Sequence, residues 1–210
     1  QLIEKVDPKN KDLELFLIKL NLAIHFYVVH LQFEKFGFIN LSPGQKISEL
    51  RNRSGEYQLY ALNADVILDS FIQLYPEKGF LYKAQADYLY DYFLHYDDNM
   101  SISKDVLTSK LEQVNRKCIE NNSADFETYF VLGSILIGQG KYDEAQRMLR
   151  KSISLNSKYP PAYYNLAYVE YILRNYSLAI DYAMVSHNLY EETSPKVDAL
   201  RLVSYAYDLQ

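Results

Sequence analysis

The histidines and nearby carboxylates are the first candidates for catalysis or metal binding in this sequence. There are four histidines: His25, His30, His95 and His187. They form neither an i, i+4 pair nor the His-Glu-x-x-His pattern of a helical zinc site. His95, Asp97 and Asp98 are close enough in sequence to share a metal ion, but a solvated loop explains these polar residues better. We therefore expect no catalytic residue, no metal site and no cofactor, and we do not expect an enzyme.

Two other signals of chemistry have structural explanations. Gly138-Gln139-Gly140 lacks the following Lys-Ser/Thr that completes a phosphate-binding loop, and it falls where one helix would turn into the next. Cys118 is the only cysteine, so an internal disulfide is excluded. It lies 34 residues before Ser152 and 68 before Ser186, which are both small, and this spacing predicts a buried packing residue.

Composition narrows the class of protein. About half of the 210 residues are apolar (49%), which excludes a disordered chain. The net charge is -5 and no cluster of Lys or Arg occurs, so we expect no nucleic-acid partner. The chain has 21 tyrosines and no tryptophan. Tyrosine can lie half-buried with its hydroxyl in water, which suits a protein with much surface per residue.

The elements that must position any site repeat with a period of 34 residues. The matched pairs are Tyr129/Tyr163, Leu132/Leu166, Gly133/Ala167, Tyr142/Tyr176, Ala145/Ala179, Ser152/Ser186 and Leu155/Leu189. Within each copy the apolar residues follow the i, i+3, i+4, i+7 spacing of a helix face. A period of about 34 residues is typical of helical hairpins that must stack to bury their apolar faces. The small residues of the pattern predict where paired helices approach closely.

These copies resemble tetratricopeptide repeats, most clearly over residues 126–193. The same frame reappears from Ala64 and Leu68, which match Ala145 and Leu149, and again from Tyr82, which matches Tyr129. The resemblance implies an all-α fold, an α-solenoid of antiparallel helical hairpins that forms a superhelix. It also implies a protein-interaction scaffold or adaptor.

The chain is expected to have two parts within one solenoid. Residues 1–55 would form a long helix over 11–35 and then an irregular connection over 36–55. Residues 56–210 would form about three hairpins, one of them with an insertion near 95–103, and a C-terminal capping helix. The apolar run from Leu13 to Phe33 is interrupted by polar residues such as Lys19 and His25, so we expect a buried helix and no membrane insertion.

By the same resemblance, the first helices of successive hairpins line a concave face that receives a peptide or partner helix. The residues expected to contact this partner are Tyr90, Phe130, Ile137, Tyr164, Asn165, Tyr168, Tyr171, Leu202 and Tyr205. Large tyrosine side chains provide contact area with few torsions to fix. The alternative is that these tyrosines simply pack on one another and on a missing C-terminal repeat.

One subclass of the family holds the C-terminal carboxylate of a chaperone peptide with Lys, Asn and Arg side chains. The corresponding positions here are Phe130, Ser134, Asn165, Pro195 and Ala199. Only Asn165 matches, so we do not expect a carboxylate clamp. The rival function is structural, in which the same surfaces join copies of the chain into a homo-oligomer.

Overall fold

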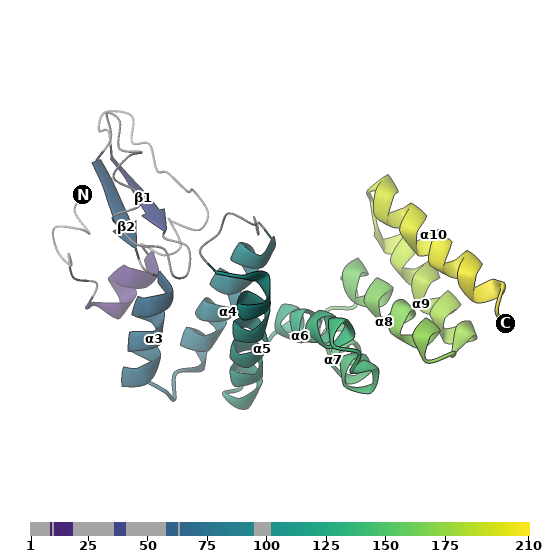
Figure 1. Ribbon diagram of the computed structural model, residues 1–210, viewed down its shortest axis with the longest axis horizontal. Helices are drawn as coiled ribbons and strands as arrows, with labels where there is room; N and C mark the ends of the chain where they lie inside the picture. The colour runs from purple at the N-terminus through teal and green to yellow at the C-terminus, as the bar shows by residue number, and fades with distance from the viewer. Residues whose placement is uncertain (1–8, 10, 19–35, 41–57, 63, 95–101) are drawn as a thin grey trace. The chain divides into compact units, whose positions relative to one another are not determined.

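The computed structural model describes residues 9, 11–18, 36–40, 58–62, 64–94 and 102–210 (Figure 1). The chain divides into two compact units, Gln1–Lys110 and Leu111–Gln210, so the division falls inside helix α5. The helices are α3 (Ala64–Leu74), α4 (Gly79–Leu94), α5 (Lys104–Glu120), α6 (Phe126–Gly138), α7 (Tyr142–Leu155), α8 (Pro160–Ile172), α9 (Tyr176–Leu189) and α10 (Thr193–Tyr207).

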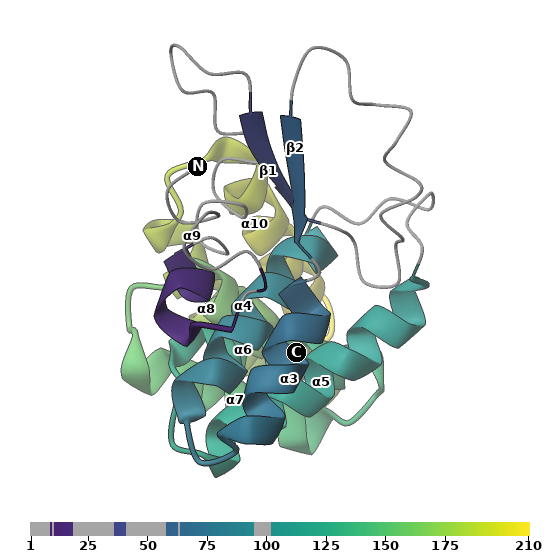
Figure 2. The same ribbon diagram turned by 90° about the vertical axis from the view of Figure 1, so that its left-hand side faces the viewer.

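The first unit contains a pair of short strands that the sequence analysis did not expect. Strands β1 (Phe36–Asn40) and β2 (Gln58–Leu62) run parallel, with Phe36 opposite Gln58 and Asn40 opposite Leu62 (Figure 2). The prediction of an irregular connection was therefore wrong for residues 36–40. Aromatic and β-branched residues such as Phe38 favour extended backbone, but a five-residue segment is too short for periodicity alone to identify. The all-α prediction is confirmed for the array of hairpins.

The predicted N-terminal helix is described only at its beginning. Residues 13–18 are helical, and the Phe16 ring stacks on the Phe71 ring of α3 at 5.6 Å between centroids. Residues 19–35 of that prediction, and the expected start of the array at residue 56, lie outside the described residues.

The repeat frame in the first unit shows the burial that the sequence comparison implies. Ala64 and Leu68 of α3 are fully buried, as are their matched residues Ala145 and Leu149 of α7. The first-helix tyrosines also make the same contact in both units. Tyr82 donates its hydroxyl to the carbonyl of the residue six positions earlier at 3.1 Å, and Tyr163 does so at 3.2 Å.

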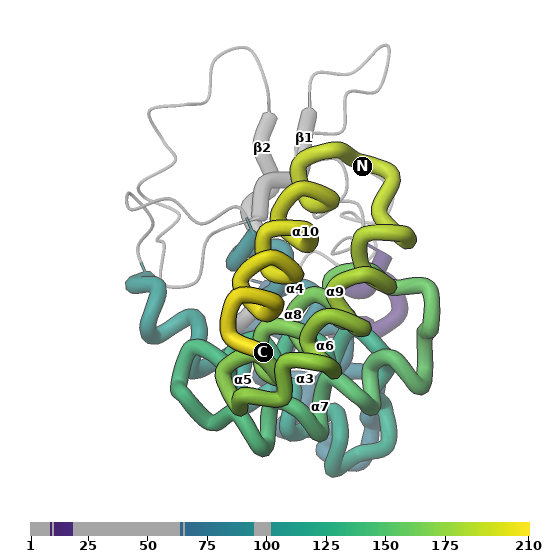
Figure 3. The backbone as a smooth tube through the Cα atoms, turned by 90° about the vertical axis from the view of Figure 1, so that its right-hand side faces the viewer, coloured from purple at the N-terminus to yellow at the C-terminus, as the bar shows by residue number. Residues whose placement is uncertain are grey.

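The second unit is a run of helices in which each packs against its neighbours in the chain. Helix α6 packs on α7, α7 on α8, α8 on α9, and α9 on α10. Figures 1 and 3 show α8, α9 and α10 side by side, connected by short turns. The expected insertion near 95–103 belongs to the connection before α5, where residues 95–101 lie outside the described part.

Small side chains bring the two helices of each hairpin together. A Cβ atom on Gly133 would lie 2.9 Å from Leu149 Cγ, so α6 and α7 approach too closely for a larger residue. Ser152 and Ser186 are fully buried and have a second role. Their hydroxyls donate to the carbonyls of Phe126 (2.7 Å) and Pro160 (3.1 Å), which open the first helix of the same hairpin.

In both hairpins of the second unit, a residue with a left-handed backbone conformation lies in the turn between the two helices. Gly140 fills this position between α6 and α7 with φ 71°, and Arg174 fills it between α8 and α9 with φ 64°. For a residue with a side chain this conformation is unfavourable by about 1–2 kcal/mol. Glycine pays much less.

Replacement of Arg174 by glycine should therefore raise the free energy of unfolding, by about 1 kcal/mol. Urea unfolding followed by circular dichroism measures this change. Gly140→Arg is the matched control and should lower stability by a similar amount. An unchanged or lowered urea midpoint for Arg174→Gly would show that the turn carries no such strain.

Candidate partner-binding surface

The residues first considered for chemistry do not form a reactive site in the described part of the chain. Cys118 is fully buried, which confirms the burial predicted for a packing residue. Among the described residues no group of three His, Cys, Asp or Glu side chains is placed to hold a metal ion. His95, Asp97 and Asp98 lie outside those residues. No helix within the described ranges is long and apolar enough to cross a membrane.

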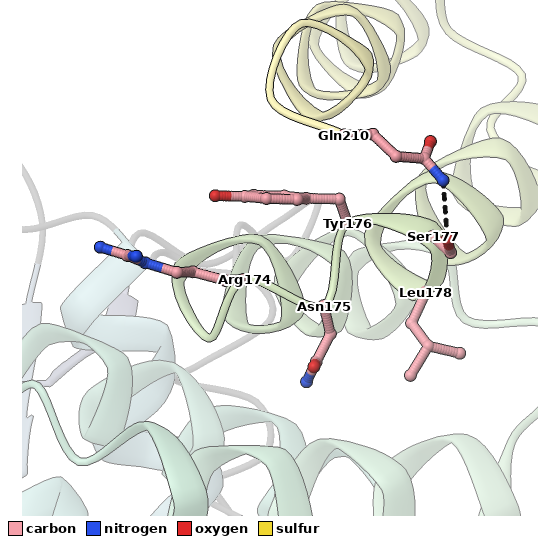
Figure 4. Close-up of a pocket in the computed structure, with 6 residues that line it drawn as sticks. All are labelled: Arg174, Asn175, Tyr176, Ser177, Leu178 and Gln210. Atoms are coloured by element: carbon pink, nitrogen blue, oxygen red, sulfur yellow. Dashed lines mark hydrogen bonds between the residues drawn. The ribbon is translucent and has the colours of Figure 1, made fainter.

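A hollow of about 390 Å³ lies where α9 begins, next to the end of α10. It is lined by Arg174, Asn175, Tyr176, Ser177, Leu178 and Gln210. Figure 4 shows the Gln210 amide bonded to the Ser177 hydroxyl at 2.9 Å, while Asn175 and Leu178 point away from the Tyr176 ring. Its side chains do not converge on one point, so the hollow does not resemble a catalytic site.

The first helices of the second unit form a continuous surface. Helix α8 contacts both α6 and α10. On this surface Tyr168 of α8 is 37% exposed and Tyr205 of α10 is 57% exposed. We use the name first-helix surface for the side chains of α6, α8 and α10 predicted to face a partner and left wholly or partly exposed: Phe130, Ile137, Tyr164, Asn165, Tyr168, Tyr171 and Tyr205.

The α6 residues of this surface pack on the hydrophobic core. Phe130 and Ile137 are half-buried and pack against the core that contains Leu132 and Leu136. The Phe130 ring also meets the Tyr159 ring edge to face, with 5.0 Å between centroids. Such packing restricts the Phe130 and Ile137 side chains, so little side-chain freedom would be lost in forming a further contact.

Three further predicted contact residues, on α8 and α10, belong partly or wholly to the core. Leu202 is buried in a cluster with Ala167 and Ala183, so its side chain is not available to a partner. Tyr164 and Tyr171 pack against the same cluster and remain half-buried. Tyr168 and Tyr205, in contrast, remain exposed.

Asn165 is engaged within the protein. Its side-chain amide donates to the Ser134 hydroxyl at 2.8 Å and so joins α8 to α6. The Ser134 hydroxyl in turn donates to the Phe130 carbonyl. Tyr90 is half-buried in α4 and belongs to the first unit, so its part in a shared surface stays a prediction.

At α10 this surface has tyrosine rings and an exposed ion pair, in which Arg201 contacts Asp198 at 3.0 Å. Burial raises the pKa of Tyr164, and the nearby Asp198 and Tyr168 raise it further. Burial also raises the pKa of Tyr190, with Tyr164, Glu192 and Asp198 adding to the effect. The sequence analysis missed Tyr190 because it follows the second helix of its hairpin and belongs to no first-helix face.

Sequence reasoning also missed Glu170, a fully buried carboxylate in α8. Its Oε1 accepts from Gln146 and Arg150 of α7, both at 2.9 Å, and its Oε2 accepts from the Asn175 amide at 2.8 Å. The hydrogen bond that Arg150 donates to Glu170 is the main cause of the raised pKa of Arg150. Glu170 thus fastens α7, α8 and the following turn together. The sequence did contain a signal for Glu170: the matched position one repeat earlier holds Leu136, so an acid occupies a position expected to be buried.

Comparison with known proteins supports this fold. Residues 126–159 match the family model of the tetratricopeptide repeat. The segment begins with α6 and covers the first complete hairpin of the second unit. No curated protein matches the chain in sequence.

Solved structures with a similar fold include the TPR2B domain of yeast Sti1 in complex with pHsp70. It is 16% identical with a TM-score of 0.51, and the match covers 62% of this chain and 99% of that one. Yeast Tom70 is 16% identical with a TM-score of 0.54, over 69% of this chain and 29% of its own. YrrB, a TPR protein with an unusual peptide-binding site, is 13% identical with a TM-score of 0.57, over 100% and 93%. At these identities the likeness shows the fold alone.

Proposed function

We propose that this chain, a tetratricopeptide-repeat protein by its match over residues 126–159, is a scaffold or adaptor that binds a protein or peptide on the first-helix surface. The observation that carries the proposal is the exposure of Tyr168 and Tyr205 on adjoining helices, beside the half-buried Phe130 and Tyr164. Aromatic residues held by a rigid support are typical anchors of protein interfaces. The structures of the Sti1 domain with pHsp70 and of YrrB are consistent with this use of the fold.

The test compares a double variant of two exposed tyrosines, on α8 and α10, with a double variant of two exposed residues on the second helix α9. The partner is first retained from an extract of the source cells on immobilised protein, identified, and titrated against purified variants. Tyr168→Ala with Tyr205→Ala should weaken binding by about 2 kcal/mol or more, because both changes remove anchor area. Both side chains are exposed, so helicity should be unchanged.

The matched control is Leu178→Ala with Val185→Ala on α9, which are 40% and 38% exposed. This pair should leave affinity unchanged. Wild-type affinity in the tyrosine variant, together with a loss in the α9 variant, would assign binding to the second helices and contradict the proposal.

The second candidate function is structural, the self-association of the chain into a homo-oligomer, and the exposure of one α10 residue favours it. Leu200 is 42% exposed, although the matched residues Leu132 and Leu166 are fully buried beneath the next helix. An apolar residue at this position suits a face that another helix covers, as a second copy of the chain would. Light scattering at two protein concentrations separates the two candidates, because only self-association raises the mass with concentration.

A further inference from the structure

Helix α10 carries an exposed apolar stripe at the outer end of the second unit (Figure 1). Val197, Leu200 and Tyr207 are exposed, and so is the small Ser204. These four residues are spaced i, i+3, i+7 and i+10, so they share one face of the helix. We call their side chains the outer stripe of α10. Apolar residues in this spacing are typical of a helix face that packs on another element.

The preceding first helices show what covers the matched face elsewhere in the array. Leu200 matches Leu132 of α6 and Leu166 of α8, which are both fully buried. Helix α6 packs on α7 and α8 packs on α9, the second helices of their hairpins. No helix among the described residues covers Leu200 in this way, because its side chain is exposed. The outer stripe therefore suits a covering helix.

One residue beside the outer stripe disfavours an ordinary second helix as the cover. Gly133 occupies the matched position on α6, where even a Cβ atom would lie 2.9 Å from Leu149 Cγ of α7. Helix α10 has Arg201 there. A helix seated on α10 as α7 is seated on α6 would therefore collide with the Arg201 side chain. A covering helix must cross α10 elsewhere, and Ser204 is the small residue of the stripe that allows a close approach.

Two opposite charges follow one side of the outer stripe. Arg201 and Asp208 are seven residues apart, so they lie two helical turns apart on the same side, whereas Lys196 lies on the other side. Arg201 makes an exposed pair with Asp198 at 3.0 Å, a type of contact that contributes little. The Asp208 carboxylate has no ion pair within the described part of the chain. Both charges are thus available to a covering helix.

We propose that the outer stripe of α10 is the contact between two copies of this chain, with the two α10 helices antiparallel and crossing at Ser204. Leu200 then packs on Tyr207 of the second copy, because position 204 lies about midway between them. For the same reason Arg201 pairs with Asp208 of the second copy. The stripe is thus complementary to itself in size and in charge, as a twofold contact requires. The inference rests on the second candidate function, self-association, and leaves the first-helix surface free.

Light scattering of the full chain across a dilution series tests this contact. One short stripe per copy buries little area, so the mass should rise with concentration from 24.6 kDa toward that of a dimer and no further. Leu200→Glu should weaken association about tenfold or more, because the dimer would bury an unpaired carboxylate. Val185→Glu changes an exposed residue of α9 and is the matched control, without effect. A constant monomer mass, growth beyond the dimer, or equal effects of the two variants would overturn the inference.

A pair of charge reversals tests which residues meet across the contact. Arg201→Asp and Asp208→Arg each place like charges opposite one another twice in a dimer, so each alone should weaken association about tenfold. Mixed in equal amounts, the two variants restore both opposite-charge pairs and should form a heterodimer with nearly wild-type affinity. Arg147→Asp and Asp181→Arg, on the exposed sides of α7 and α9, are the matched control pair and should associate like wild type alone or mixed.

The outcomes separate this contact from the functions proposed above. A wild-type dimer without rescue in the mixture would place the contact on another surface, which overturns the inference and keeps self-association. A monomer at every concentration would overturn both and leave the adaptor function, which the Tyr168 and Tyr205 variants test separately. Rescue in the mixture, without a change in the control pair, is the result that the antiparallel contact predicts.

Discussion

Replacement of Glu170 by alanine should lower the free energy of unfolding by about 2–4 kcal/mol. The carboxylate is fully buried and accepts three hydrogen bonds, from Gln146, Arg150 and Asn175. Truncation removes all three bonds and leaves a space at the contact of α7 with α8. The Arg150 side chain is 51% exposed and can regain water, so the loss stays below that of a wholly buried pair.

Urea unfolding followed by circular dichroism measures this loss, with two variants as references. Glu170→Leu should cost less than Glu170→Ala, because leucine fills the space and already occupies the matched position 136. Glu191→Ala removes an exposed acid and should change the midpoint little. Equal midpoints for Glu170→Ala and Glu191→Ala would show that the bonds to α7 and the turn do not stabilise the array.

Replacement of Gly133 by valine should cost about 3 kcal/mol by overpacking the α6–α7 hairpin. Even the first added carbon would lie 2.9 Å from Leu149 Cγ and 3.5 Å from Met148 Cβ. Leu149 is fully buried and belongs to the core cluster with Leu132 and Leu136. The next hairpin agrees with this explanation. It has the larger Ala167 in place of Gly133, and the matched residue on its second helix is Ala183, which is smaller than Leu149.

A double-mutant cycle with Leu149→Ala tests the contact itself. Leu149→Ala alone should cost about 2–5 kcal/mol through the cavity it leaves. The double variant should lose less than the sum of the two single losses, because the valine fills part of that cavity. Additive losses would mean that Gly133 and Leu149 do not limit each other, and would contradict the close approach of the two helices.

The sequence predicted the hairpins well because their packing depends on residues that recur. The recurrence of Ala145 as Ala179 and of Ser152 as Ser186 placed small residues at helix contacts, and all four are fully buried. The same argument placed Cys118 in the core. It also carried the frame into α3, where Ala64 and Leu68 are buried as predicted.

Features that occur once were not predictable in this way. Strands β1 and β2 pair residues about 22 positions apart, and no local pattern reports such a contact. Two of the three partners of Glu170, Gln146 and Arg150, lie on α7, which becomes its neighbour only when the hairpins stack. Leu202 was assigned to the binding face by position, but the turn of α10 directs it into the core. Whether the remaining tyrosines bind a partner stays a prediction.

The packing of each second-unit helix against its chain neighbours has a consequence for how this unit folds. Its contacts join segments close in sequence, so little loop entropy is lost before they form, and folding should be fast for its length. Such an array also opens from its ends instead of all at once. Helix α10 has its main contact with α9, so its amide hydrogens should exchange with solvent sooner than those of α8, which is held on both sides.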